Sequence, residues 1–210
     1  GDTVTYSITG SEINIDTSTG AISFATAPDY ETKTSYSTTV TASDGTTPVD
    51  QIITVNINNL NDNIPELTSG STYTADENQT AIGTVTATDA DGDTLSFSVT
   101  GSEINIDSDS GVMTFASAPD YETKSSYSTE LTVSDGENSR SVEIVVNIND
   151  VNDNSPVFTS SATFSAAENQ TAIGIVTATD ADGDTLIYSI SGSEITINSS
   201  TGVLTFASTP

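Results

Sequence analysis

Two short segments, residues 60–65 (LNDNIP) and 151–156 (VNDNSP), are rich in side chains that could bind a cation. Each follows a run that alternates apolar and polar residues, as a β-strand does. Each also ends in a proline, which cannot donate the next hydrogen bond of a sheet. We interpret both segments as linkers between domains, whose carboxylate, amide and backbone oxygens face a cation.

Further acidic residues are expected to gather at these linkers. The loops of a β-sandwich cluster at its two ends, so the last loops of one domain meet the first loops of the next. At the first linker the acids are Asp29, Glu31, Asp62, Asp89, Asp91 and Asp135, and at the second they are Glu77, Asp120, Glu122, Asp153, Asp180 and Asp182. Carboxylates this close repel one another unless cations lie between them. A site with only oxygen donors favours Ca2+, since Mg2+ requires a stricter octahedron.

The composition excludes several other kinds of site. With 3 Lys+Arg against 30 Asp+Glu, the chain of 210 residues has a formal net charge of -27, so nucleic acid and anionic membrane surfaces repel it. The absence of Cys and His excludes disulfides, thiolate or imidazole metal ligands, and Ser-His or Cys-His nucleophiles. No apolar run approaches the roughly 20 residues that span a bilayer, and we expect any targeting segment to lie outside these residues.

The sequence repeats with a period of 91 residues. GSEI at 10–13 recurs at 101–104 and 192–195, and DYETK at 29–33 recurs at 120–124. A period this long matches one β-sandwich domain and exceeds the roughly 20 to 50 residues of solenoid repeats. We predict three units: 1–62 is the C-terminal part of a first repeat, 63–153 a complete second repeat, and 154–210 the N-terminal part of a third.

The complete repeat has the pattern of an all-β domain. Thr, Ser, Val and Ile dominate it, and no window keeps helical spacing over three turns. The odd positions of 95–99 and the even positions of 142–148 are expected to face inward and to close a sandwich core. Seven strands are predicted, at 71–75, 82–88, 95–100, 104–107, 112–116, 127–134 and 141–149.

Five motifs in order at this period resemble tandem cadherin repeats, in the variant found in large bacterial surface proteins. They are the Asn-Asp-Asn-x-Pro linkers, Glu77-Asn78, Asp89-Ala90-Asp91, Asp120-Tyr121-Glu122 and Ser134-Asp135-Gly136. The resemblance covers the whole chain and implies tandem Greek-key β-sandwiches, of cadherin or immunoglobulin-like type, with Ca2+ between repeats. It implies the ligands Asp29, Glu31, Asn61, Asp62, Asn63, Asp89, Asp91 and Asp135 at the first junction. At the second it implies Glu77, Asp120, Glu122, Asn152, Asp153, Asn154, Asp180 and Asp182.

The chain departs from the pattern of animal cadherins. Tyr30 and Tyr121 stand where those proteins usually carry Arg between two acids. The first linker follows Asn59 where the second follows Asp150, which predicts a slightly weaker first cluster. The acidic loop ends at Asp93 and lacks the later Asn that completes one ion's shell; the sequence leaves open whether this aspartate or water replaces it. The chain has no Trp, so an adhesive mechanism that exchanges Trp side chains does not carry over.

Other readings of these motifs are less economical. Asp89 to Asp93 is not an EF-hand, since no helices flank it, and its alignment with the linker argues against a plain solvated turn. Asn78-Gln79-Thr80 and Asn169-Gln170-Thr171 match the N-glycosylation pattern, which we interpret as coincidence. Asp89 and Asp91 are two residues apart in a repeated loop without sign of a cleft, so a glycosidase pair is not indicated and we predict no enzyme.

We predict an extracellular, Ca2+-stiffened array in the extension region of a large bacterial adhesin, serving cell or surface adhesion, biofilm or matrix. One alternative is a polysaccharide-binding module, which the lack of an aromatic platform disfavours; Tyr30 and Tyr121 are more simply cover for the sandwich edge. Another is self-association of the repeats into filaments, with residues 155–210 of one chain pairing with residues 1–58 of another.

Overall fold

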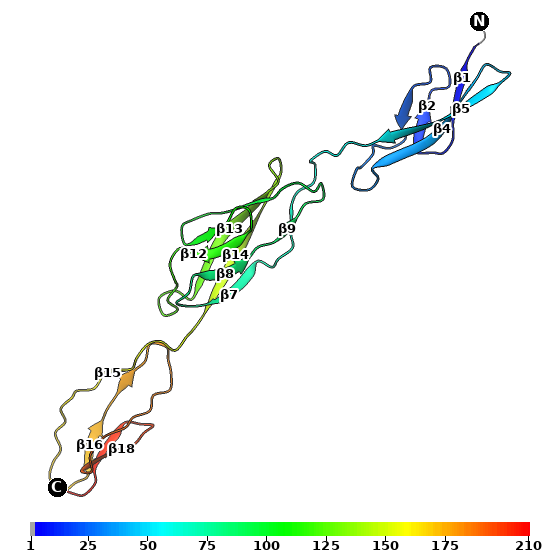
Figure 1. The fold of residues 1–210 in the computed structure, drawn as a ribbon. Helices are drawn as coiled ribbons and strands as arrows, with labels where there is room; N and C mark the ends of the chain where they lie inside the picture. Colours follow the sequence, from blue (N-terminus) through cyan, green and yellow to red (C-terminus); the bar gives the residue numbers. More distant parts are fainter. Residues whose placement is uncertain (1–2) are drawn as a thin grey trace.

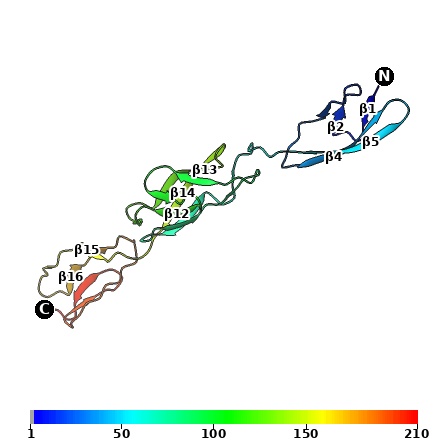
Figure 2. The same ribbon diagram turned by 45° about the horizontal axis from the view of Figure 1, so that its top comes forward.

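A computed structural model of the protein describes residues 3–210, and every regular element in this range is a β-strand. The strands form three groups that follow one another along the chain, separated by residues 57–65 and 150–156. The three groups lie in a row, as two views of the ribbon show (Figure 1, Figure 2). The described part of the chain contains no helix long and apolar enough to cross a membrane.

The first group has two small sheets. Its strands are β1 (Thr5–Ile8), β2 (Ile13–Ile15), β3 (Ile22–Phe24), β4 (Ser35–Ser43) and β5 (Pro48–Asn56). β1, β4 and β5 form one antiparallel sheet in that order, and β2 pairs with β3. The turn that follows β3 carries Asp29 and Glu31 to the end of this group that meets the first linker.

The middle group has the most complete set of strands. They are β6 (Glu66–Leu67), β7 (Thr72–Asp76), β8 (Ala81–Thr84), β9 (Ala87–Thr88), β10 (Ser96–Val99), β11 (Ile104–Ile106), β12 (Val112–Phe115), β13 (Ser126–Ser134) and β14 (Ser139–Asn149). One sheet has the order β10-β13-β14-β7, in which β7 runs parallel to β14. A second sheet has the order β11-β12-β8, and β6 pairs with β9.

The third group repeats part of the middle group. Its strands are β15 (Val157–Phe158), β16 (Ala172–Ile175), β17 (Ala178–Thr179), β18 (Ile195–Ile197) and β19 (Val203–Phe206). The order β16-β19-β18 corresponds to β8-β12-β11, and the pair β15-β17 corresponds to β6-β9. The sequence period is therefore also a period of strand pairing.

Alternate residues of the two larger sheets make the core of the middle group. Leu131, Ile144 and Val146 from one sheet and Met113 from the other have no exposed surface. In β10, Phe97 is buried whereas the serines on either side are exposed. The predicted inward faces of 95–99 and 142–148 and the predicted all-β fold are confirmed.

The predicted strands differ from the structure mainly between residues 66 and 88. The predicted strand 82–88 is two strands, β8 and β9, because the chain changes partner in its middle. The Val85 N–H donates to the Gly111 carbonyl (2.9 Å) beside β12, whereas the Thr86 carbonyl accepts from the Thr68 N–H (2.8 Å) beside β6. β6 is two residues long, too short to show alternation in the sequence. The other six predicted strands agree with the structure to within two residues.

Gly111 permits a close approach between two segments of the middle group. Its φ is +70°, and a Cβ at this position would lie 2.3 Å from the Val85 carbonyl oxygen. We expect Gly111→Ala to lower the free energy of unfolding by about 3 kcal/mol, because a left-handed backbone and overpacking both oppose the methyl group. Chemical denaturation measures this loss.

Gly101→Ala is the matched control for this substitution. Gly101 also has a positive φ, +85°, but an added Cβ would meet no atom within 4 Å. This variant should lose only about 1 kcal/mol. Equal losses for the two variants would show that the close approach at Gly111 does not matter.

Candidate metal centre

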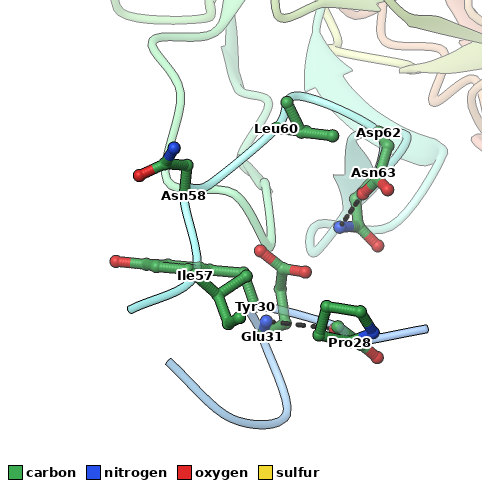
Figure 3. A pocket seen from close by; sticks show the side chains of 9 residues that line it. Pro28, Tyr30, Glu31, Ile57, Asn58, Leu60, Asp62 and Asn63 are labelled. Carbon is green, nitrogen blue, oxygen red and sulfur yellow. Dashed lines mark hydrogen bonds between the residues drawn. The ribbon is translucent and has the colours of Figure 1, made fainter. Parts of the chain in front are cut away.

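Three carboxylates from three separate segments converge at the joint between the first and middle groups. Glu31 comes from the turn after β3, Asp62 from the linker and Asp91 from the loop after β9. One oxygen of each lies within 4.8 Å of the others. The Glu31 carboxylate points toward the linker across a hollow of about 690 Å³ (Figure 3). Like charges at this distance repel, and a cation between them would relieve this repulsion.

The linker backbone holds Asp91 in place. Asp91 Oδ2 accepts hydrogen bonds from the N–H groups of Asp62 (3.1 Å) and Asn63 (2.9 Å), and Oδ1 accepts from Asn63 Nδ2 (2.9 Å). Partial burial opposes ionisation of Asp91, but the hydrogen bonds that it accepts from Asn63, Glu31 and Asp62 together outweigh burial and lower the pKa of this carboxyl. Asp91 is therefore ionised and fixed against the linker.

Two carboxylate oxygens at the same joint, Asp89 Oδ2 and Asp135 Oδ2, are buried and have no hydrogen-bond partner. The other oxygen of each acid is used within its own loop. Asp89 Oδ1 accepts from the Asp91 N–H (2.9 Å), and Asp135 Oδ1 accepts from the Asn138 N–H (2.6 Å). A buried carboxylate oxygen without a partner is unfavourable, and coordination to a cation would satisfy it.

Asn138 ties the Asp135 loop to the linker. Its Nδ2 donates to Asn61 Oδ1 (2.8 Å) and to the carbonyl oxygens of Asn61 and Asn63 (both 3.3 Å). The predicted residues Asn61 and Asp135 are thus brought together through Asn138, which is absent from the prediction. Asn138 does not recur with the repeat period, because Thr47 occupies the corresponding position in the first unit, so the repeats do not identify it.

The joint between the middle and third groups contains two overlapping clusters. Glu77, Glu122 and Asp153 form one, and Glu122, Asp150 and Asp182 form the other, each with carboxylate oxygens within 4.8 Å of one another. Because Glu122 belongs to both clusters, one side chain connects them. Four different segments of the chain supply these five acids.

The buried Glu77 side chain connects two segments of the second joint through hydrogen bonds; we call this role a clamp. This side chain is only 3% exposed. Its Oε2 accepts from the Tyr121 N–H (2.9 Å), in the turn that carries Glu122, and its Oε1 accepts from the Val151 N–H (2.9 Å) in the linker. One buried carboxylate therefore fixes the position of the turn relative to the linker.

At the second joint, burial and neighbouring carboxylates destabilise the ionised forms of Glu122 and Asp150. Burial raises the pKa of Glu122, and the carboxylates of Glu77 and Asp182 raise it further. Burial also raises the pKa of Asp150, with added repulsion from Asp182, Glu77 and Asp184. A bound cation would relieve this repulsion.

Asp150 was not among the predicted ligands, although its difference from Asn59 is visible in the sequence. At the first joint this position is the neutral Asn59, whose Nδ2 donates to the Asp91 carbonyl (2.9 Å). At the second joint the same position is Asp150, whose carboxylate belongs to a cluster. The weaker first cluster stays a prediction.

The contacts between linker and acidic loop recur from one joint to the next. Asn154 donates to both oxygens of Asp182 (2.9 and 2.8 Å), as Asn63 does to Asp91. Asn152 Nδ2 donates to Asp184 Oδ2. Asp180, Asp182 and Asp184 also lie within 4.8 Å of one another, and so do their counterparts Asp89, Asp91 and Asp93.

Two predicted acids, Asp29 and Asp120, lie beside the clusters but use their oxygens in their own turns. Asp29 Oδ1 accepts from the Glu31 N–H (3.1 Å), and its Oδ2 accepts from the Thr32 hydroxyl (2.9 Å). Asp120 makes the equivalent bond to the Thr123 hydroxyl (2.9 Å). These acids shape the turns that present Glu31 and Glu122.

Fold and site together define a row of β-sandwich repeats with carboxylate clusters at the joints. No protein-family model matches the chain. Human Protocadherin Fat 1 is 37% identical over 177 residues, 74% of the chain, and human Protocadherin Fat 4 is 34% identical over 191 residues, 81% of the chain. The chain spans about 4% of the length of each of these relatives.

Solved structures are similar over nearly the whole length. The mouse Cadherin-23 EC22-24 structure matches with a TM-score of 0.79 and 26% identity, covering 99% of this chain and 76% of that one. The chain therefore belongs to the family of cadherin-like domains. The predicted tandem β-sandwich architecture is confirmed.

Proposed function

We propose that the chain binds Ca2+ at both joints. The observation that carries this proposal comes from the first joint, where Asp89 and Asp135 each have a buried, unpartnered carboxylate oxygen in loops held against the same linker. The carboxylate clusters of the second joint support the same role there. The first joint would use Asp29, Glu31, Asn61, Asp62, Asn63, Asp89, Asp91 and Asp135. The second would use Glu77, Asp120, Glu122, Asn152, Asp153, Asn154, Asp180 and Asp182.

The donors present fit a hard divalent cation. They are carboxylate, amide and backbone oxygens from three or more segments at each joint, and the chain contains neither His nor Cys. Such a set suits Ca2+, which accepts six to eight oxygens in a flexible arrangement. When bound, the ion supplies the positive charge that lets carboxylates of separate segments share one site.

The residues of the chain prepare this site. Glu77 holds the turn of Glu122 to the second linker, and Asn63 and Asn154 hold Asp91 and Asp182 to the two linkers. Each linker is thereby attached to the acidic loop of the group that follows it. Without a cation, repulsion among the clustered acids favours opening of each joint.

We further propose that residues 1–62, 63–153 and 154–210 are consecutive repeats of an extracellular array that functions in adhesion. Stiff joints would keep the array extended and hold a distal binding domain away from the cell surface. Tyr30 and Tyr121 within the Asp-x-Glu motifs, the short acidic loops and the absence of Trp support an extension region of the bacterial surface-adhesin type.

Small-angle scattering and limited proteolysis test this function. In millimolar Ca2+ the chain should scatter as a rod and resist cleavage at 57–65 and 150–156. Chelation should broaden the distribution of lengths and expose both segments, while the β-sheet circular dichroism of the three groups persists. Mg2+ should restore the rod poorly. Identical scattering and cleavage with and without Ca2+ would contradict the proposal.

A further inference from the structure

We propose that Asp93 is an additional Ca2+ ligand at the first joint, and that Asp184 has the same role at the second. This inference rests on the proposed function and adds to it the acid at the end of each Asp-Ala-Asp-Gly-Asp loop.

The geometry of the loop brings Asp93 back to Asp89. Gly92 has a φ of +82°, which turns the chain, and the Asp93 N–H lies 3.5 Å from Asp89 Oδ1. Carboxylate oxygens of Asp89, Asp91 and Asp93 lie within 4.8 Å of one another. Asp93 is exposed, so it could turn into solvent to escape this repulsion.

A separate observation is that one carboxylate oxygen of this loop has no hydrogen-bond partner. Asp89 Oδ2 is buried and makes no hydrogen bond, while Asp89 Oδ1 already accepts from the Asp91 N–H. Because carboxylate oxygens of Asp89 and Asp93 lie within 4.8 Å of each other, a cation bound by Asp89 would have the Asp93 carboxylate within reach. The negative charge of Asp93 would then be stabilised by the positive charge of the ion.

The second joint supports the same role through a different contact. Asp184 accepts from the side-chain amide of Asn152, a predicted ligand in the linker. The nitrogen and oxygen of such an amide exchange places when the side chain rotates by half a turn. With a cation present, Asn152 and Asp184 would then both offer oxygens to it. Linker and acidic loop would be joined through the ion as well as directly.

Limited proteolysis at graded Ca2+ concentrations tests the two aspartates, because it reports on each joint separately. Asp93→Asn should raise the Ca2+ concentration needed to protect 57–65 by about tenfold, as expected when a charged ligand becomes neutral. Protection of 150–156 should not change. Asp184→Asn should give the reverse pattern.

Glu143→Gln is the matched control, since it removes one negative charge from an exposed position in β14. It should leave both protection curves within about twofold of the parent. Circular dichroism confirms that all variants fold. A crystal structure in Ca2+ should then show an Asp93 oxygen on the ion.

The inference is wrong if Asp93→Asn and Glu143→Gln give the same Ca2+ protection curves, or if a crystal structure shows an ion bound by Asp89 while Asp93 faces solvent. Neither result would contradict the proposed function. A parent chain that takes up no Ca2+ would overturn the proposed function and this inference with it.

Discussion

Replacing Asp153 with Ala should loosen the joint between the middle and third groups without unfolding either of them. Asp153 lies in a cluster with Glu77 and Glu122, and it accepts hydrogen bonds from Asn78 (2.5 Å) and Asn154 (2.8 Å). The substitution removes one metal ligand and one charge, while the remaining acids still repel one another. The core of the middle group contains none of these residues.

We therefore expect the variant to keep its β-sheet circular dichroism at high Ca2+. It should become more flexible in solution, and cleavage at 150–156 should be at least ten times faster than in the parent at the same Ca2+ concentration. Additional Ca2+ should partly restore protection, because an ion that binds only the ordered joint stabilises it by mass action.

Asp62→Ala is the paired variant for the first joint. It should expose 57–65 and leave 150–156 protected, so the two variants serve as controls for each other. If Asp153→Ala remains as extended and as resistant to protease as the parent, Asp153 does not hold the joint.

Replacing Glu77 with Ala should have the largest effect on stability among the candidate ligands. The substitution leaves the backbone N–H groups of Tyr121 and Val151 without their buried acceptor. Hydrogen bonds to a charged group contribute roughly 1.5 to 3 kcal/mol each, so we expect a loss of about 3 kcal/mol even in a chelator. In Ca2+ the loss should be larger, since a metal ligand disappears as well.

Glu77→Gln and Glu168→Ala separate these two contributions. Glutamine keeps one acceptor oxygen, so it should recover part of the stability in a chelator but little of the Ca2+ affinity at the second joint. Glu168 is the counterpart of Glu77 in the third group and is exposed, so Glu168→Ala should cost less than 0.5 kcal/mol. Urea denaturation with and without Ca2+ measures these differences. A Glu77→Ala variant as stable as the parent in chelator would contradict the role of Glu77 as a clamp.

The sequence predicts the fold well because two independent patterns agree. Alternation identifies the inward faces of β10 and β14, and the repeat period places equivalent strands in all three groups. The sequence predicts strand boundaries less well where one extended run pairs with two different strands, as at Val85 and Thr86. The change of partner does not alter the alternation of apolar and polar residues.

The candidate site shows a similar limit. Acid type and spacing indicate which loops meet, but the same residue type can bind a metal or cap a turn. Asp29 and Asp120, both proposed ligands, also hydrogen-bond within their own turns, and these bonds are visible only in the three-dimensional arrangement. Asn138 could not be predicted, since its contact with Asn61 depends on the path of the loop between β13 and β14.

Diffraction from crystals grown in millimolar Ca2+, with anomalous data to identify the ions, would show directly whether both joints bind Ca2+. We predict Ca2+ between Glu31, Asp62 and Asp91 and between Glu77, Glu122 and Asp153, with oxygen ligands about 2.3 to 2.6 Å from each ion. Well-ordered joints that contain no ion, with these acids turned into solvent, would contradict this prediction.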